Sequence, residues 1–249
     1  MSEHQLQAGV AAPPEFFDAL YQGRGVSFGE HAPRMEVVPW QLDGPQPLLT
    51  ELEAAGEITD PVLECGCGLG ENAMFLAGKG YAVTAFDASN AAIERNRAKA
   101  RAAGSSVRFM VADATSLEGI PGGFNTVVDS AMLHCLTDEQ RRTYLDGLRR
   151  VCQPAARLHV FCFQTGSADA LQMPASMDEA SLRQAFRECG WNIHRIQTRS
   201  YTTDMTRKQA HEQMPAELRE HLMPDLDNQN ISEQEGFSFP VWQITAQLV

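Results

Sequence analysis

The chain has 249 residues, 43% of them apolar, a size and composition typical of one globular domain, 1–249, with a buried core. Its formal net charge of −12 argues against a nucleic-acid partner, because binding to phosphates needs clustered Lys and Arg. No stretch approaches the roughly 18 apolar residues of a membrane span, and no basic start followed by an apolar run marks a secretory signal. We therefore expect a cytoplasmic protein without a membrane partner.

A cap segment, 14–47, precedes the first predicted strand. Pro14–Tyr21 reads as a helix with Pro near its start, and 22–47 is a long segment rich in Gly and Pro. A segment of this length without periodicity is usually functional or disordered, and Trp40 within it argues against disorder. A second helix is predicted from Pro47 to Glu57.

A glycine-rich turn follows the apolar strand 61–64. Gly66, Gly68 and Gly70 lack a Cβ, so the backbone can bend tightly and lie against a ligand, while a helix over 72–79 offers its N–H groups. This pattern indicates a nucleotide-type site, although it overlaps the dinucleotide fingerprint.

Three carboxylates end three consecutive predicted strands. Glu64 precedes the glycines, Asp87 closes 81–86 and Asp113 closes 107–112. Because parallel strands end at the same edge of a sheet, these acids are expected at one ligand site. An acid before the glycines suits an ammonium group better than a pyrophosphate, and an acid at position 87 can accept from a ribose. The alternative is that all three are solvated strand-end acids.

The run from Glu64 to Gly70, with the two later acids, resembles motif I and its followers in class I S-adenosylmethionine-dependent methyltransferases. The resemblance implies an α/β fold: a doubly wound, mostly parallel, Rossmann-like sheet of seven strands, with an antiparallel last strand and helices on both faces. In the resemblance, Glu64 and the glycine backbone hold the methionine part, Asp87 takes the ribose hydroxyls and Asp113 helps to recognise the adenine. The positions that it assigns to the cofactor are Trp40, Glu64, Gly66, Gly68, Gly70, Asp87, Ala88, Asp113, Ala114 and Ser130.

The N-terminal segment narrows the resemblance. Phe-Phe-Asp-Ala-Leu-Tyr at 16–21, followed by Pro-Trp-Gln-Leu-Asp-Gly-Pro-Gln-Pro at 39–47, resembles the thiopurine methyltransferase-like branch. In that branch the Trp lies over the cofactor, a role carried here to Trp40, whose alternative is core packing.

Beyond the third acid, Ser89 is expected to cap a helix over 90–103, and a strand over 125–129 precedes a helix that the capping box Thr137–Gln140 opens. Pro154-Ala155-Ala156 stands where the family carries Pro-Gly-Gly, so we expect that turn to avoid a positive φ before the strand 157–163.

The C-terminal third predicts a helix, two strands and an insert. A capping box at 176–179 opens the helix, and 191–199 reads as a strand. The last strand, 239–249, is expected near a sheet edge because it contains Pro240. The segment 202–236 is interpreted as a lid or dimer contact, or as a surface excursion without function.

We expect transfer of a methyl group to sulfur or nitrogen of a small heteroaromatic or thiol acceptor. In-line displacement needs positioning more than acid–base chemistry, so the catalytic candidates are limited to the nearest possible bases, His134 and Asp129. The packed-histidine interpretation of His134 stays open. The acceptor-facing candidates are Tyr21, Phe28 and Met35.

Two other functions remain: an NAD(P)-dependent oxidoreductase, which Glu64 and Glu71 disfavour, and a non-catalytic cofactor-binding subunit. The six cysteines lack zinc-site spacing, so reduced thiols and no metal are expected.

Overall fold

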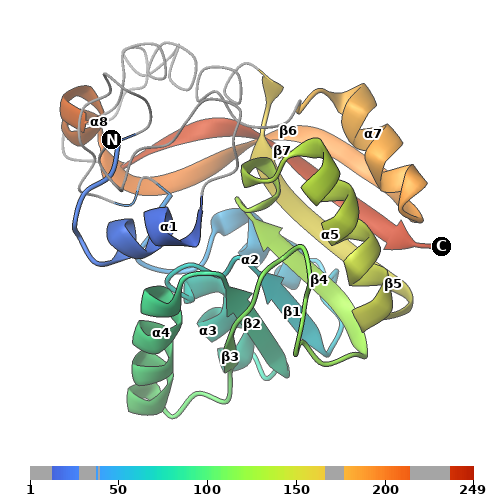
Figure 1. Cartoon of the computed structure of the whole chain (residues 1–249), viewed down its shortest axis with the longest axis horizontal. Coiled ribbons are helices and arrows are strands. Elements are labelled where there is room, and N and C mark those ends of the chain that lie inside the picture. Colours follow the sequence, from blue (N-terminus) through green and yellow to red (C-terminus); the bar gives the residue numbers. More distant parts are fainter. Residues whose placement is uncertain (1–12, 28–37, 39, 166–176, 214–235) are drawn as a thin grey trace.

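The computed structural model describes residues 13–27, 38, 40–165, 177–213 and 236–249, and it contains one seven-stranded sheet with helices on both faces (Figure 1). The strands are β1 (Val62–Cys65), β2 (Val83–Asp87), β3 (Arg108–Val111), β4 (Phe124–Ser130), β5 (Cys152–Phe163), β6 (Trp191–Thr206) and β7 (Gly236–Leu248). Their order is β3-β2-β1-β4-β5-β7-β6. The first five run parallel and β7 is antiparallel to both its neighbours, which confirms the predicted fold class.

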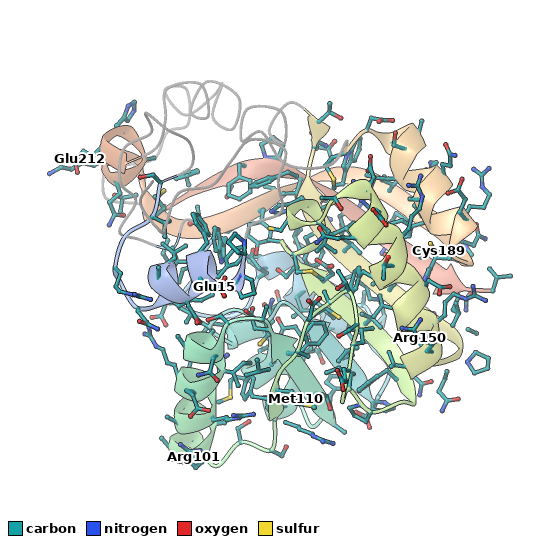
Figure 2. The ribbon with its side chains drawn as sticks, in the orientation of Figure 1. Glu15, Arg101, Met110, Arg150, Cys189 and Glu212 are labelled. Atoms are coloured by element: carbon teal, nitrogen blue, oxygen red, sulfur yellow. The ribbon has the colours of Figure 1, made fainter. Side chains whose placement is uncertain are left out.

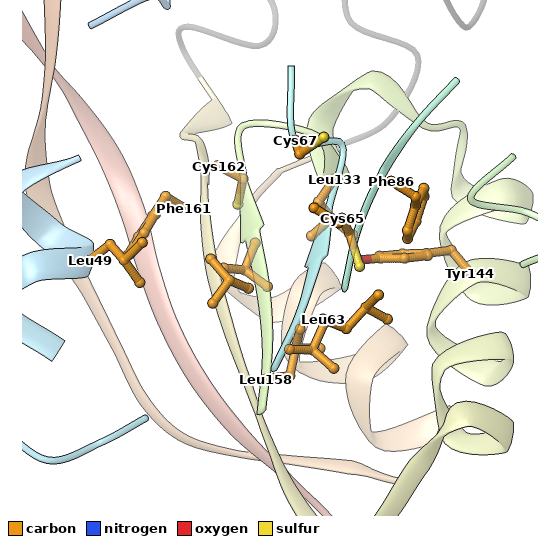
Figure 3. Close-up of a cluster of buried hydrophobic side chains, with 14 of the residues drawn as sticks. Leu49, Leu63, Cys65, Cys67, Phe86, Leu133, Tyr144, Leu158, Phe161 and Cys162 are labelled. Carbon is orange, nitrogen blue, oxygen red and sulfur yellow. The ribbon is translucent and has the colours of Figure 1, made fainter. Parts of the chain in front are cut away.

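The helices divide between the two faces of the sheet. They are α1 (Pro14–Tyr21), α2 (Pro47–Ala54), α3 (Glu71–Gly78), α4 (Asn90–Ala103), α5 (Asp138–Val151), α7 (Glu179–Glu188) and α8 (Arg207–Gln213), with a 3₁₀ turn, η1 (Leu133–Cys135). Right-handed crossovers place α3 and α4 on one face and α5 on the other. Figure 3 shows Leu49 of α2 and Tyr144 of α5 on opposite sides of the strands.

Capping side chains start the helices that flank the strand ends. Ser89 Oγ accepts from Ala92 N at 3.1 Å, as expected for α4. Both halves of the box formed by Thr137 and Gln140 are present at α5, at 3.0 and 3.2 Å. These caps fix where each helix leaves the sheet edge.

The capping box predicted at 176–179 is wrong. Asp178 caps α7 by accepting from Ser181 N at 2.9 Å, and Ser176 lies outside the described residues. An Asp directly before the first helical turn caps a helix as well as a Ser does, and the sequence contains both Ser176 and Asp178 before this helix.

Helix α1 packs on the N-terminal end of α4. Asp18 Oδ1 accepts from Ala91 N at 3.0 Å and also from the Ser89 hydroxyl. Figure 2 shows Arg101 at the opposite end of α4, remote from α1. The negative side chain therefore lies at the end of α4 that carries positive partial charge.

The last strand lies near an edge of the sheet and is antiparallel, as predicted, but it is not the edge strand itself. β7 lies between β5 and β6, and β6 is the edge strand. The pairing with β5 stops at Phe163 opposite Val241, so Pro240 faces only Ser200 of β6. The sheet has narrowed to a two-stranded ribbon there, and the missing N–H of Pro240 costs no bond to β5.

The turn before the body of β5 also departs from expectation. Ala155 adopts a φ of 64°, so alanine takes the left-handed conformation that the family's glycine permits. Its carbonyl accepts from Gln247 Nε2 at 3.1 Å, a bond that helps to hold the turn.

The predicted insert begins later than 202. β6 continues to Thr206 and α8 follows, so residues 202–206 belong to the sheet. The part of the insert over 214–235 lies outside the described residues.

Candidate functional site

The glycine turn between β1 and α3 is built for close contacts. Gly66, Gly68 and Gly70 have φ values of 64°, 49° and 79°. A Cβ on Gly66 would lie 2.5 Å from Met132 Cγ. Both the backbone conformation and the available space therefore require glycine.

Asp87 fastens this turn to the end of β2. Its Oδ2 accepts from Gly68 N and its Oδ1 from Ser89 N, both at 2.8 Å. Burial raises the pKa of this carboxyl above its usual range, and the N–H donors partly oppose the increase. Ala88 follows on the surface at the same sheet edge.

Glu64 lies at the end of β1, 2% exposed, on the side of α3. Burial raises its pKa to about 8, and the Asn72 side chain and the Ala73 N–H, which lie beside its carboxyl, partly oppose the increase. Among the described residues, Glu64 Oε2 has no hydrogen-bond partner. A buried acceptor without a donor indicates that a ligand supplies one.

The cap segment covers the glycine turn. The Tyr21 hydroxyl lies 3.0 Å from the place that a Cβ on Gly68 would take, and the Trp40 side chain lies beside it. Trp40 also packs edge-on against Phe17, with ring centroids 6.1 Å apart. The predicted site residues Phe28 and Met35 lie outside the described residues.

Asp129 holds the turn that follows β4. Its Oδ1 accepts from the backbone N–H groups of Met132 and Leu133, at 3.0 and 3.1 Å, and its Oδ2 from the Tyr144 hydroxyl at 3.1 Å. Within this turn Ala131 adopts a φ of 72°. Burial raises the pKa of Asp129 to about 6. Its carboxylate is surrounded by three hydrogen-bond donors and lies beside a strained residue, and it positions the backbone of this turn. The Tyr144 hydroxyl also points to the Cys65 sulfur (Figure 3).

His134 stacks on Phe163, with ring centroids 4.2 Å apart. Its Nδ1 accepts from Phe163 N at 3.4 Å, which leaves the ring proton on Nε2. Burial lowers its pKa to about 3, so the ring is neutral at physiological pH. A catalytic role for His134 or Asp129 stays a prediction.

The third strand-end acid lies on the surface. Asp113 Oδ1 accepts from Thr115 N at 2.6 Å and from Thr115 Oγ1 at 2.7 Å, which forms a tight turn after β3. Ala114 lies in this turn and packs partly against the core. Asp113 and Ala114 thus border the same sheet edge as Glu64 and Asp87, one strand further out.

Three polar residues of this region were missed in the sequence: Tyr201, Gln46 and Asn72. The Tyr201 hydroxyl of β6 lies 3.0 Å from Oγ of the predicted site residue Ser130, and Gln46 and Asn72 lie beside Glu64. Gln46 stands between two prolines in the sequence. Its side chain is only 3% exposed, and the sequence could not predict that burial.

A separate pocket of about 460 Å³ lies at the C-terminal end of α1. It is lined by Tyr21 of α1, by Leu69 of the glycine turn and by Arg95, Asp204 and Met205. The strand-end acids do not line it, so the arrangement of the acids, and not this cavity, marks the site.

Known proteins share both the sequence pattern and this fold. A profile of methyltransferase domains matches residues 62–155. A 2-heptyl-1-hydroxyquinolin-4(1H)-one methyltransferase of Mycobacteroides abscessus is 29% identical over 172 residues, 68% of this chain and 74% of the relative. An uncharacterised methyltransferase of Schizosaccharomyces pombe is 30% identical over 108 residues, 43% of this chain and 74% of its own length.

A solved structure from a study of the conversion of a disulfide bond into a thioacetal group during echinomycin biosynthesis is 32% identical. It matches 95% of this chain and 93% of its own, with a TM-score of 0.70. The chain belongs to the class I S-adenosylmethionine-dependent methyltransferases. Magnesium protoporphyrin IX methyltransferase from Synechocystis PCC 6803 with bound cofactor, 17% identical, shares the fold at a TM-score of 0.54, over 81% of this chain and 76% of its own.

The described residues of this methyltransferase fit its cofactor, S-adenosylmethionine. The turn at Gly66 to Gly70 has no room for side chains, and Glu64 Oε2 lacks a donor that an ammonium group would provide. Within the described ranges, no three His, Cys, Asp or Glu side chains are grouped as metal ligands. No helix of the described chain is long and apolar enough to cross a membrane.

Proposed function

We propose that this methyltransferase methylates sulfur or nitrogen of a small heteroaromatic or thiol acceptor. The observation that supports an aromatic acceptor is a row of rings beside the end of β4. His134 packs on Phe163, and Phe163 and Tyr201 each lie 5.4 Å from Phe239 between ring centroids. We call His134, Phe163, Phe239 and Tyr201 the aromatic row.

The aromatic row meets the strand edge at Ser130. The Tyr201 hydroxyl lies 3.0 Å from Ser130 Oγ, and all four members of the row are buried. A flat acceptor stacked against such rings gains about 0.5–1.5 kcal/mol beyond the burial of its area. The row therefore favours an aromatic ring over an aliphatic chain.

The cofactor supplies an electrophilic methyl group. In the proposal, Glu64 and the backbone of Gly66, Gly68 and Gly70 bind its amino-acid end, and Asp87 with Ala88 binds the ribose. Asp113 and Ala114 border the adenine, Trp40 covers the site and Ser130 faces the acceptor. Orientation and exclusion of water by these groups can lower the barrier by about 7–11 kcal/mol.

Proton removal from the acceptor depends on His134. Its Nδ1 must release the Phe163 N–H, a 3.4 Å bond, before it can take a proton, and its Nε2 can only donate. Asp129 already accepts three hydrogen bonds. An acceptor that ionises readily, such as a thiol or an acidic ring N–H, needs least help from such a site.

Two relatives support this acceptor class. The name of the Mycobacteroides abscessus relative specifies a hydroxyquinolinone, which is heteroaromatic, and the structure that is 32% identical comes from sulfur chemistry on a disulfide. Assignment to the thiopurine methyltransferase-like branch stays a prediction. The oxidoreductase alternative is not favoured, because Glu64 precedes the glycines and Glu71 stands where a dinucleotide site needs its third glycine.

The test is transfer of isotope-labelled methyl from the cofactor to a panel of aromatic thiols, aliphatic thiols, N-heterocycles and hydroxyquinolinones. We expect labelled products from aromatic thiols or N-heterocycles, and none with Asp87→Ala. Labelling confined to hydroxyl oxygen or to added protein or RNA would contradict the proposal, and labelling confined to aliphatic thiols would contradict the preference for a ring that the aromatic row supports.

A further inference from the structure

Two buried oxygen atoms of neighbouring side chains beside the glycine turn lack a hydrogen-bond donor in the part of the chain that the structure describes. Gln46 and Glu64 are 3% and 2% exposed, and within the described chain neither Gln46 Oε1 nor Glu64 Oε2 has a hydrogen-bond donor. A buried acceptor that stays unpaired costs stability, and native proteins pair most of them. Two such atoms in one cluster indicate a ligand that carries several donors.

Asn72 joins the two residues. Gln46 N donates to Asn72 Oδ1 at 2.9 Å, and the Asn72 side chain lies beside the carboxyl of Glu64 and lowers its pKa. Tyr201 lies beside both, since the Gln46 side chain and the Glu64 carboxyl each act on the pKa of its hydroxyl. Gln46 and Glu64 therefore belong to the same site, although 18 positions separate them in the sequence.

The amide of Gln46 is held in one orientation. Its Nε2 donates to Thr202 O at 2.8 Å, so Oε1 is left as the acceptor. A flipped amide would place its oxygen against Thr202 O and lose this bond, and the structure thus presents an oxygen and not a nitrogen to the ligand.

We propose that Gln46 Oε1 and Glu64 Oε2 together bind the ammonium group of the cofactor, with Tyr201 and Thr202 holding Gln46 in place. An ammonium group has three donors and no acceptor, which matches one charged and one neutral acceptor. A second carboxylate at position 46 would repel Glu64, whereas an amide adds an acceptor without charge. Gln46 lies outside the matched methyltransferase profile, and its assignment rests on the family's cofactor and not on the acceptor proposed above.

The arrangement also links the two halves of the site. The Tyr201 hydroxyl lies beside the Gln46 side chain on the cofactor side and 3.0 Å from Ser130 Oγ on the acceptor side. The edge strand β6 thus reaches the cofactor through one hydroxyl, and loss of that hydroxyl should loosen Gln46 without removing it.

The test is calorimetric titration with two ligands that share the adenosine part. S-adenosylhomocysteine carries the ammonium group, and 5′-deoxy-5′-methylthioadenosine lacks the whole amino-acid end. The readout is the ratio of the two dissociation constants, which is independent of methyl transfer. The Gln46→Met variant keeps the side-chain length and removes the acceptor, and Tyr201→Phe removes the hydroxyl alone.

For Gln46→Met we expect the preference for S-adenosylhomocysteine to fall about 10- to 100-fold, the range for a hydrogen bond to a charged group. Tyr201→Phe should lower it in the same direction by a smaller factor. The matched control is Gln197→Met on β6, whose amide donates to Gln243 Oε1 at 2.9 Å, and its ratio should not change.

An unchanged ratio in Gln46→Met would overturn the inference, whether the binding of both ligands stays the same or weakens equally. A ratio that falls in Gln46→Met, together with a wild type that labels neither thiols nor N-heterocycles of the panel, would instead count against the proposed acceptor class alone. The two proposals can therefore fail separately.

Discussion

Replacement of Glu64 by Gln should stabilise the ligand-free protein while it weakens cofactor binding. Burial raises the pKa of Glu64 from its ordinary value of 4.5 to about 8. Between these two pH values the folded protein holds a proton that the unfolded chain has released, so wild-type stability falls as the pH rises. Glutamine cannot ionise, and its amide keeps the size and shape of the glutamate side chain beside Asn72 and Ala73.

The magnitude follows from the two pKa values. A change from 4.5 to about 8 corresponds to about 5 kcal/mol above pH 8, of which about 3 kcal/mol is already lost at pH 7. We therefore expect Glu64→Gln to exceed wild type in free energy of unfolding by about 3 kcal/mol at pH 7. The gap should close near pH 4.5 and reach its maximum above pH 8.

Urea unfolding of both ligand-free proteins at several pH values measures this gap. Glu71→Gln is the matched control, because Glu71 is a neighbouring acid at the start of α3 that pairs with Lys99 and is partly exposed. We expect it to change stability by at most about 1 kcal/mol. Equal stability of Glu64→Gln and wild type at pH 8, or a gap that does not grow with pH, would refute the reasoning.

Three further substitutions test how the strand-end turns are held, each by urea unfolding. Tyr144→Phe removes the donor to Asp129 Oδ2 and should cost about 1–3 kcal/mol, whereas no loss would show that this bond is dispensable. Ala155→Gly relieves a φ of 64° and should stabilise by about 0.5–1 kcal/mol; destabilisation would contradict that strain. Gly70→Ala places a Cβ 3.0 Å from Phe109 Cζ at a φ of 79° and should cost about 2 kcal/mol or more, so wild-type stability would argue against the tight turn.

The sequence alone predicts the part of the site that depends on the order of consecutive strands along the chain. Glu64, the glycines and Asp87 stand at the ends of consecutive strands, and a parallel sheet brings such positions together without further information. The helix caps at Ser89 and Thr137 depend on neighbours within three residues and were also predictable.

The residues that were missed depend on contacts between distant segments. Gln46 meets Thr202 across 156 positions, and Tyr201 reaches Ser130 across 71, through the ribbon of β6 and β7. The place of Pro240 follows from where β5 stops, which no local pattern encodes. Ala155 shows that a strained φ can be tolerated where the residue preference would forbid it.

The central claim is that the edge formed by β1 and β2 binds S-adenosylmethionine. Calorimetric titration of wild type and Asp87→Ala with S-adenosylhomocysteine, with NADH in parallel, tests it most directly. We predict that S-adenosylhomocysteine binds wild type, that Asp87→Ala loses this binding and that NADH binds neither protein. Undiminished binding to Asp87→Ala, or binding of NADH in place of S-adenosylhomocysteine, would contradict the claim.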